Sequence, residues 1–268
     1  MNPQLPVLYS VEAGIARLVL NRPDDGNAIS LAFCAAFADA VEQIARADLR
    51  VLVISANGPR FCSGGDIGEF VENRERLPEH IGAMLERLNP AMKQLASLPV
   101  PVVSVVHGSA GGAGIALACC ADFVLASDRV RVRGGYTAIG LTPDIGASYH
   151  VAQRIGAARA KRLFILNETF DARQCLAMGL FDQLHAPEEL AGAAEALIRT
   201  LACGATTAFG LVKQLCDGAA GRDVQTHLDI EGAALLASTR SADAREGVQA
   251  FIEKREPRFT GHPLSQGG

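Results

Sequence analysis

A glycine-rich turn near the middle of the chain is the first feature that could do chemistry. Residues 101–128 read PVVSVVHGSAGGAGIALACCADFVLASD, with an apolar run at 102–106, a group of glycines and a small apolar segment at 115–120. This order predicts a strand, a glycine turn and a helix, followed by a second strand at 123–126. Glycines let a ligand approach the backbone closely, and unpaired amides at the start of a helix attract negative charge. The stretch therefore predicts an anion hole.

Another glycine turn, Ser63-Gly64-Gly65-Asp66, follows an apolar strand expected at 50–55. In chain order it is the first glycine turn, and the turn at 108–114 is the second. One such turn is weak evidence of a site, because tight turns need glycine in any case. Two of them at the carboxyl ends of strands favour a ligand crevice that both turns share.

The composition excludes several classes of function. The chain has 268 residues, of which 49% are hydrophobic, and is long enough for one large α/β domain or a domain with an appendage. Its net charge of −4 gives no general attraction to nucleic acid or to anionic membranes. No apolar run reaches the ~18 residues that span a bilayer. The start of the chain lacks the features of a signal peptide, so a cytoplasmic protein is expected.

Seven cysteines are present, without any CxxC pair. Most lie among alanines and leucines, where a free thiol behaves as a small hydrophobe, so neither a disulfide framework nor a zinc site is predicted. Cys62 lies beside the first glycine turn. No histidine stands near it in the sequence, and a buried thiol is the favoured interpretation.

Hydrophobic periodicity places the elements around these turns. Expected strands lie at 5–9, 15–21, 50–55, 102–106, 123–126, 129–133 and 181–184. Expected helices lie at 31–47 (capped by Ser30), 78–97, 115–120, 157–166, 171–178, 188–202, 205–217, 224–240 and 244–253. Near residue 190 the pattern changes from mixed α/β to helix alone. This change divides the chain into a core at 1–190 and a helical region at 191–268.

Six segments in register resemble the crotonase (enoyl-CoA hydratase/isomerase) superfamily over about the whole chain. They are NRPDDGNAIS, RFCSGGDIGEF, HGSAGGAGIALACCADFVLAS, IGLTPDIGASYHVAQRIG, LNETFDARQCLAMGLFDQL and EGVQAFIEKREPRF. The resemblance implies an α/β fold with a spiral core of ββα units and a C-terminal helical part used in trimerisation. It also implies a homotrimer or a hexamer of two trimers, and acyl-CoA thioester substrates. No metal and no cofactor beyond the coenzyme A moiety of the substrate are expected.

The resemblance assigns the anion hole to the main-chain amides of Gly65 and Ala113. Negative charge collects on the thioester oxygen when a proton leaves the α carbon, and two fixed amides would stabilise that enolate. Ala113 stands where the family usually has glycine, so its φ must be negative. Residues that the resemblance places along the coenzyme A channel are Asn27, Ala28, Ile29, Ser63, Asp66 and Ile67. Phe259 is expected to reach the nucleotide or pantetheine of a neighbouring subunit.

The catalytic base is the point at which this sequence departs from enoyl-CoA hydratases. The two glutamates that hold water in those enzymes align with Ala116 and Tyr136, and neither is a carboxylate. Asp144, after Pro143, resembles the aspartate that shuttles a proton in isomerase-like members, including the ring-epoxide and oxepin isomerases of phenylacetate degradation. Thr142 and Pro143 also look like a helix start, so an aspartate favoured by the helix dipole is the competing interpretation. Tyr136 is expected to be either a hydrogen-bond donor or a wall of the acyl pocket, and the wall is the favoured interpretation.

These residues predict an enoyl-CoA isomerase of fatty acid metabolism with Asp144 as its base. The alternatives are an enoyl-CoA hydratase (a lyase) with a modified mechanism, and a catalytically impaired member that still binds acyl-CoA. Dehalogenation is disfavoured because the catalytic histidine of that branch aligns near Pro90. A dinucleotide site is disfavoured because the last glycine of a GxGxxG pattern would fall at Leu117.

Overall fold

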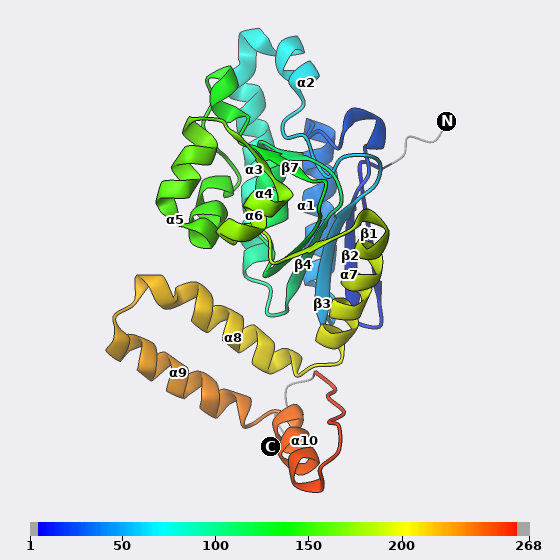
Figure 1. Ribbon diagram of the computed structural model, residues 1–268, viewed down its shortest axis with the longest axis vertical. Helices are drawn as coiled ribbons and strands as arrows, with labels where there is room; N and C mark the ends of the chain where they lie inside the picture. The colour runs from blue at the N-terminus through cyan, green and yellow to red at the C-terminus, as the bar shows by residue number, and fades with distance from the viewer. Residues whose placement is uncertain (1–4, 262–268) are drawn as a thin grey trace.

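Two β-sheets form the framework of the computed structural model, which describes residues 5–261 (Figure 1). The larger sheet has the strand order β1-β2-β3-β4-β6-β9, and only the β1–β2 pair is antiparallel. Its strands are β1 (Val7–Glu12), β2 (Ile15–Leu20), β3 (Val51–Ala56), β4 (Val102–Val106), β6 (Phe123–Ser127) and β9 (Gln183–His185). The smaller sheet contains β5 (Ala110–Gly111), β7 (Arg131–Arg133) and β8 (Thr169–Asp171).

The two strands that precede the glycine turns are neighbours in the larger sheet. β3 and β4 read VLVISA and VVSVV, β-branched sequences suited to a sheet that is covered on both faces. They are parallel, with Leu52 opposite Val102 and Ile54 opposite Ser104. Because parallel strands end at the same edge of a sheet, both glycine turns emerge side by side.

Helices cover both faces of the larger sheet. On one face α1 (Leu31–Ala45) packs on α3 (Leu77–Ala96). Ser30 caps α1 by accepting a hydrogen bond from the amide of Phe33 at 3.1 Å, so the predicted start of this helix is confirmed. The side of α1 that faces the sheet is fully buried in the main hydrophobic core.

The opposite face is covered by α7 (Pro187–Ala202). Leu52 and Ile54 of β3 belong to the core with α1, whereas Val51 and Val53 belong to the core with α7. This alternation follows from the two-residue period of a strand. The predicted division between residues 190 and 191 falls inside α7. Since α7 packs on the sheet, the helices that leave the core begin after it.

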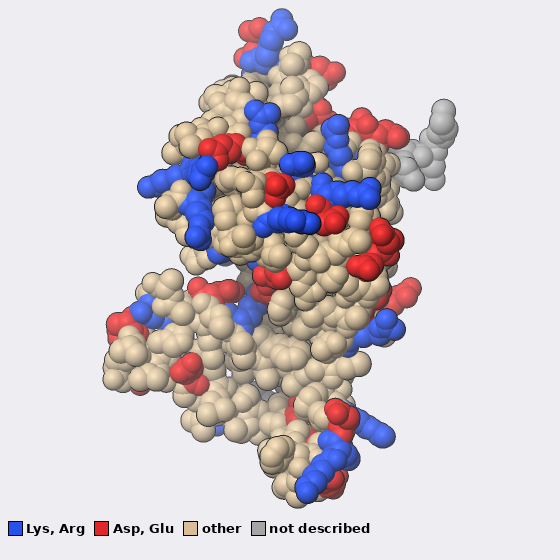
Figure 2. Space-filling view, in the orientation of Figure 1, with Lys and Arg blue, Asp and Glu red and all other residues tan. Residues whose placement is uncertain are grey.

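Three helices form an arm that extends away from the core (Figure 1). They are α8 (Thr206–Gly218), α9 (Val224–Ser238) and α10 (Ala242–Glu253). None of the residues of α9 is buried. Large apolar side chains that are exposed on the arm are Val212, Val224, Leu228, Ile230, Leu235, Leu236, Val248, Phe251 and Ile252. Figure 2 shows wide areas of the arm without charged side chains, which is typical of a surface that another chain covers.

The start of α5 (Ala147–Ile165) differs from the sequence prediction. A helix was expected to begin at residue 142, but Ile145 and Gly146 have φ angles of 40° and 89°, in the left-handed region. The helix therefore begins only after them, at Ala147. Asp144 lies in the preceding loop, so the interpretation of Asp144 as a first-turn residue of a helix is wrong.

The remaining helices are short. They are α2 (Ile67–Glu72), α4 (Ala113–Cys119) and α6 (Ala172–Met178), with 3₁₀ turns at Pro23–Asp25, Arg74–Arg76, Tyr136–Ile139 and Ala219–Gly221. The predicted helix at 157–166 is the second half of α5, after a break at Gly156. Within residues 5–261 no single helix is long and apolar enough to cross a bilayer. The pair α7 and α8 meets that criterion only when its two helices, bent by 103°, are taken together.

Candidate functional site

The two glycine turns are in contact. A Cβ atom on Gly64 would lie 3.0 Å from the carbonyl oxygen of Gly111 and 3.4 Å from the amide nitrogen of Ala113. Gly64 also has a φ of 98°, which residues with side chains rarely adopt. The amide of Gly111 donates a hydrogen bond to the carbonyl of Cys62 at 2.9 Å and so ties the turns together. The turns therefore form one continuous backbone surface.

The amides of Gly65 and Ala113 donate to no other group among residues 5–261. Ile29 pairs with Gly65 in a parallel bridge: its amide donates to the carbonyl of Gly64 at 2.8 Å, and its carbonyl accepts from the amide of Asp66 at 3.0 Å. This pairing uses the groups on either side of the Gly65 amide and leaves that amide unpaired. Ala113 is the first residue of α4 and has a negative φ, as its side chain requires.

A third backbone segment packs against the second turn and carries Tyr136. A Cβ atom on Gly135 would lie 3.4 Å from the amide nitrogen of Gly112, and this amide donates to the carbonyl of Arg133 at 3.3 Å. Gly135 has a φ of 80°, which favours glycine at this position. The backbone of Tyr136 therefore lies beside the turn that contains Ala113.

Tyr136 and Asp144 are joined by a hydrogen bond. The phenol donates to Oδ1 of Asp144 at 2.6 Å, and no described side chain donates to Oδ2. Burial raises the pKa of Asp144, and the hydrogen bond from Tyr136 opposes this shift without reversing it. The pKa of Tyr136 is also raised, first by burial and then by the charge of Asp144, so the phenol stays protonated. Tyr136 thus holds the aspartate by a hydrogen bond, and its role as a wall of the acyl pocket stays a prediction.

Neither of the two positions that carry glutamate in hydratases holds a carboxylate. Ala116 is fully buried in α4, and Tyr136 is 8% exposed. The pair of Tyr136 and Asp144 also lies near the first turn. After burial and Asp144, the thiol of Cys62 contributes to the raised pKa of Tyr136. Through its contact with Tyr136, Asp144 is therefore a carboxylate near both glycine turns, whereas Asp66, within the first turn itself, is bound by Arg22 and caps α2.

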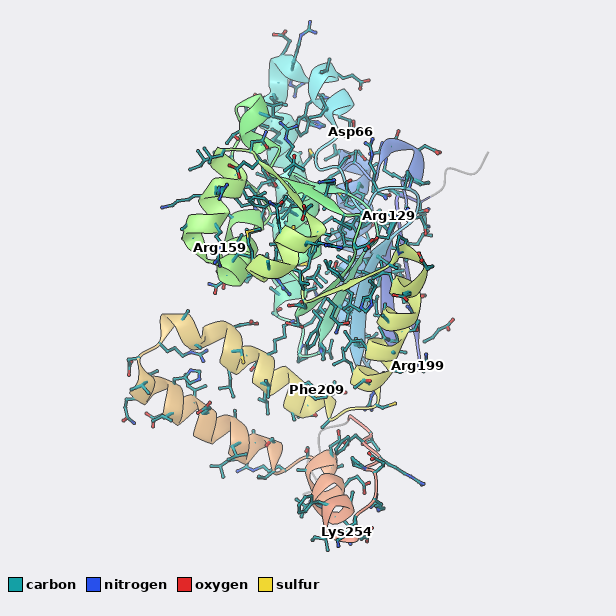
Figure 3. The ribbon with its side chains drawn as sticks, in the orientation of Figure 1. Asp66, Arg129, Arg159, Arg199, Phe209 and Lys254 are labelled. Atoms are coloured by element: carbon teal, nitrogen blue, oxygen red, sulfur yellow. The ribbon has the colours of Figure 1, made fainter. Side chains whose placement is uncertain are left out.

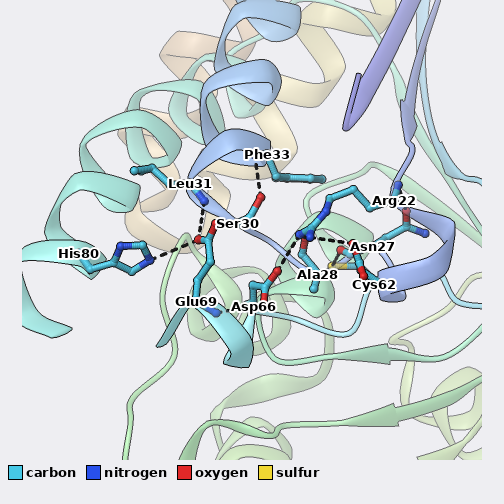
Figure 4. A network of polar contacts seen from close by, with 11 residues as sticks. Arg22, Asn27, Ala28, Ser30, Leu31, Phe33, Cys62, Asp66, Glu69 and His80 are labelled. Atoms are coloured by element: carbon cyan, nitrogen blue, oxygen red, sulfur yellow. Dashed lines mark hydrogen bonds and ion pairs between the residues drawn. The ribbon is translucent and has the colours of Figure 1, made fainter. Parts of the chain in front are cut away.

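Arg22, which no sequence motif singles out, connects the segment before α1 to the first glycine turn (Figure 4). Its Nη1 donates to the carbonyl of Ala28 at 2.6 Å and to Oδ2 of Asp66 at 2.9 Å. Its Nη2 donates to Asp25 at 2.8 Å. No spacing motif signals such a residue, because Asp66 is 44 positions away along the chain.

Asn27 uses its side chain to hold the same segment in place. Its Nδ2 donates to the carbonyls of Asn57 at 2.9 Å and Arg60 at 2.8 Å, while its Oδ1 accepts from the amide of Arg22 at 2.7 Å. Asn27 has no exposed surface and a φ of 55°. Its own amide donates to the carbonyl of Arg22 at 2.8 Å, and its carbonyl accepts from Sγ of Cys62 at 3.1 Å. Asn27 therefore holds this segment in place and has no exposed group for the coenzyme A channel for which it was predicted.

The other residues predicted for the coenzyme A channel differ in exposure. Ser63 is exposed, as is Ile67 with 52% of its surface, whereas Ala28 and Ile29 retain 7% and 1%. Asp66 is partly buried and caps the start of α2 with its carboxylate. Ser63 and Ile67 are thus the side chains of this group that a bound molecule can reach most easily.

Phe259 lies far from these residues within one chain. Its carbonyl accepts a hydrogen bond from Arg50 at 3.4 Å, and its ring approaches Gly247 of α10. Figure 3 shows Asp66 near α2 at one end of the molecule and Lys254, at the end of α10, at the other. The expectation that Phe259 reaches a neighbouring subunit stays a prediction.

Two further features lie outside this arrangement. Cys62 is buried, which raises the pKa of its thiol to about 12, and its Sγ donates to the carbonyl of Asn27 at 3.1 Å. A cavity of about 810 Å³ lies between α5 and α8, where Tyr149 and Lys213 are among its lining residues. None of the predicted site residues lines this cavity. In the part of the chain that the structure describes, no group of three possible ligand residues could hold a metal ion.

The fold and the paired glycine turns define an α/β protein of the crotonase type. A sequence model of the enoyl-CoA hydratase/isomerase family matches residues 10–262. The 1,2-epoxyphenylacetyl-CoA isomerase of Escherichia coli is 36% identical over 95% of this chain and 98% of its own length. The trans-2-decenoyl-[acyl-carrier-protein] isomerase of Streptococcus mutans is 33% identical with the same coverage. The protein in a crystal structure assigned to the enoyl-CoA hydratase/isomerase group, from Mycobacterium abscessus, is 34% identical in sequence to this chain.

That structure superposes with a TM-score of 0.92 and covers 96% of this chain and 100% of its own. The chain belongs to the enoyl-CoA hydratase/isomerase (crotonase) family. The family and the α/β fold with C-terminal helices that the sequence predicted are therefore confirmed, and the use of those helices in trimerisation stays a prediction.

Proposed function

We propose that the protein is an enoyl-CoA isomerase that moves a double bond through a thioester enolate. The observation that carries the proposal is the placement of one ionisable carboxyl, Asp144, near two glycine turns whose Gly65 and Ala113 amides have no internal partner. A single carboxylate suits a reaction that removes a proton and returns it elsewhere on the same substrate.

In this mechanism Asp144 carries one proton between two carbons. Its carboxylate removes a proton from the α carbon of a 3-enoyl-CoA, and the electron pair moves onto the thioester oxygen through the conjugated system. The amides of Gly65 and Ala113 stabilise the negative charge on that oxygen. Asp144 then returns the proton to the γ carbon, which leaves a 2-enoyl-CoA and restores the carboxylate.

The environment of Asp144 supports this role. Burial raises its pKa, which makes the carboxylate a stronger base and its protonated form a ready donor for the return step. Two of the relatives are named as isomerases, one acting on a coenzyme A ester and one on an acyl-carrier-protein ester. Their names favour isomerisation as the reaction class for this chain.

The test is Asp144→Asn, which keeps the shape of the side chain and removes the base. Double-bond migration and deuterium uptake at the α and γ carbons are expected to fall at least ~100-fold, while acyl-CoA binding changes little. Asp39→Asn, on the exposed side of α1, is the control and should retain full activity. Exchange that continues in Asp144→Asn would remove this residue from the mechanism.

Two alternatives predict other outcomes in the same assays. An enoyl-CoA hydratase with a modified mechanism would add solvent water to crotonyl-CoA. It would take up no deuterium at the γ carbon, because hydration involves only the α and β carbons. A catalytically impaired member would bind coenzyme A esters tightly without exchange or turnover across a panel of enoyl-CoA substrates. The absence of a carboxylate at Ala116 and Tyr136 speaks against hydration by two glutamates.

We further propose a cytoplasmic homotrimer, or a hexamer of two trimers, in which the apolar surface of the C-terminal arm is covered by neighbouring chains. The exposed Leu235 and Leu236 of α9 support this assembly. Phe259 would then approach the coenzyme A of a neighbour. Sedimentation equilibrium at micromolar concentration should report three or six chains, and a stable monomer would exclude the assembly.

A further inference from the structure

We propose that Tyr136 is a positioning residue that holds Asp144 by one oxygen and keeps its carboxylate ionised while the other oxygen faces the substrate. The inference rests on the proposed isomerase function and deepens it. It explains what Tyr136 contributes at a position that glutamate occupies in hydratases. The hydrogen bond between the Tyr136 hydroxyl and Oδ1 of Asp144, at 2.6 Å, is the geometric basis.

The phenol ring of Tyr136 is fixed by its surroundings. Its ring packs edge-on against Phe164, with 6.0 Å between ring centroids and an interplanar angle of 62°. The amide of Gly135 donates to Oδ1 of Asn167 at 2.6 Å, and the hydroxyl of Thr137 donates to the carbonyl of Phe164 at 2.7 Å. Both neighbours of Tyr136 in sequence are thus anchored, so its hydroxyl is held in one place before substrate binds.

The backbone that carries Asp144 is also constrained. Ile145, which follows it, has a φ of 40°, and a β-branched residue adopts this region only at a cost. The carbonyl of Asp144 accepts a hydrogen bond from the amide of Ala147 at 2.8 Å, at the start of α5. With the backbone fixed, the torsions of the Asp144 side chain are the remaining freedom, and the hydrogen bond from Tyr136 removes it.

The other titratable groups that face this pair do not replace the phenol. Cys34 on α1 is within electrostatic range of Asp144, and Cys62 is within range of Tyr136. Burial is the main cause that raises the pKa of each thiol to about 12, so both are neutral at physiological pH. Glu69 on α2 is also within electrostatic range of Cys34 and accepts a hydrogen bond from the amide of Leu31. Among the described residues, Tyr136 is the side chain that donates to Asp144.

This arrangement favours proton transfer over hydration. In a hydratase the water is held between two carboxylates. Here Tyr136 stands at one of the two positions, and its hydroxyl already donates a hydrogen bond to Oδ1 of Asp144. Oδ2 is left to take a proton from carbon and return it. Since a hydrogen bond to the charged form lowers a carboxyl pKa, Tyr136 offsets part of the rise that burial causes.

The test is Tyr136→Phe, which removes the hydroxyl and keeps the ring. The pKa of Asp144, followed by the ¹³C shift of its labelled carboxyl carbon in the free enzyme, should rise by about one unit. Asp144→Asn assigns the resonance. The acidic limb of kcat/KM should move to higher pH by the same amount, while KM for the acyl-CoA changes less than about two-fold.

Replacement of Tyr136 by 3-fluorotyrosine provides a second variant of nearly unchanged shape. Its more acidic phenol is a stronger donor, so the Asp144 pKa should fall rather than rise. An Asp144 pKa that is the same in the wild-type, Tyr136→Phe and fluorotyrosine proteins would overturn the inference. Because the titration needs no substrate, it decides the role of Tyr136 even when the wild-type enzyme shows no deuterium exchange. An absence of deuterium exchange in the wild-type enzyme would overturn the proposed isomerase function instead.

Discussion

The guanidinium of Arg22 lies 2.9 Å from the carboxylate of Asp66 and joins the segment before α1 to the start of α2. The same guanidinium nitrogen donates to the carbonyl of Ala28, and Asp66 at the same time caps α2. The first glycine turn is therefore held from outside by one ion pair with several hydrogen bonds. Its geometry depends on a charge that titrates at low pH.

Asp66 should make folding stability depend on pH in the acidic range. Burial pushes its pKa up, but hydrogen bonds from Arg22 and from backbone amides outweigh burial and hold the pKa of Asp66 below its usual value of 3.8. A depressed pKa in the folded state contributes stability above the unfolded pKa, and this contribution is lost as the pH falls through the folded pKa.

Asp66→Asn isolates this contribution, because asparagine is also a good N-cap. Urea unfolding should show the wild type to be more stable than the variant at pH 7. The difference should shrink below about pH 4 and disappear below the folded pKa. Asp24→Asn, an exposed control in the same segment, should show no such dependence. A wild-type advantage that stays constant from pH 7 to pH 2 would contradict this account.

Gly114 should be intolerant of a side chain because the two glycine turns meet there. A Cβ atom at this position would lie 2.4 Å from the carbonyl oxygen of Cys62 and 2.8 Å from its Cβ atom. Gly114→Ala must therefore push the turns apart, at a cost of about 1–3 kcal/mol in unfolding free energy. Because the turns carry both proposed donors, kcat should fall as well.

Gly82→Ala is the matched control for this substitution. Gly82 lies inside α3, and a Cβ atom there would have nothing within 4 Å. Alanine in a helix interior should stabilise the protein by about 0.5–1 kcal/mol and leave kcat unchanged. Equal unfolding free energies for Gly114→Ala and the wild type would show that the contact between the turns is looser than these distances indicate.

Local sequence was sufficient for the strands of the larger sheet and for the glycine turns, whereas the short strands β5 and β8 of the smaller sheet were not predicted. Apolar β-branched runs such as 102–106 predict buried strands, and the glycines that follow are needed by close backbone contacts between the turns. The start of α5 was missed because Thr142 and Pro143 fit a helix start. The left-handed φ of Ile145, which excludes that start, is a conformation that its residue type does not signal.

The polar contacts of the site could not be predicted from spacing. The hydrogen bond from Tyr136 to Asp144 depends on how the loop before α5 folds back, and the contact of Arg22 with Asp66 joins segments 44 residues apart. Such contacts are fixed by tertiary packing. The sequence singled out Tyr136 and Asp144 as candidates, but the interaction between them required coordinates.

The proposed role of Ala113 can be tested on its backbone alone. Ala113→Pro removes the amide hydrogen and keeps a negative φ. Proline is well tolerated at the first position of a helix, which is where Ala113 lies in α4, so the fold should be retained. If this amide stabilises the enolate oxygen, kcat should fall about 10²–10³-fold, the loss typical of one oxyanion donor.

Two comparisons separate the amide from the side chain. Ala113→Gly keeps the donor and should retain kcat within a few-fold, with a somewhat lower unfolding free energy. A backbone ester at residue 113 replaces the N–H by oxygen with almost no change of shape, and should lose activity as the proline variant does. Since the Gly65 amide remains in all of these proteins, residual catalysis above the uncatalysed rate is expected. Full kcat in both the proline and the ester proteins would place the oxyanion elsewhere.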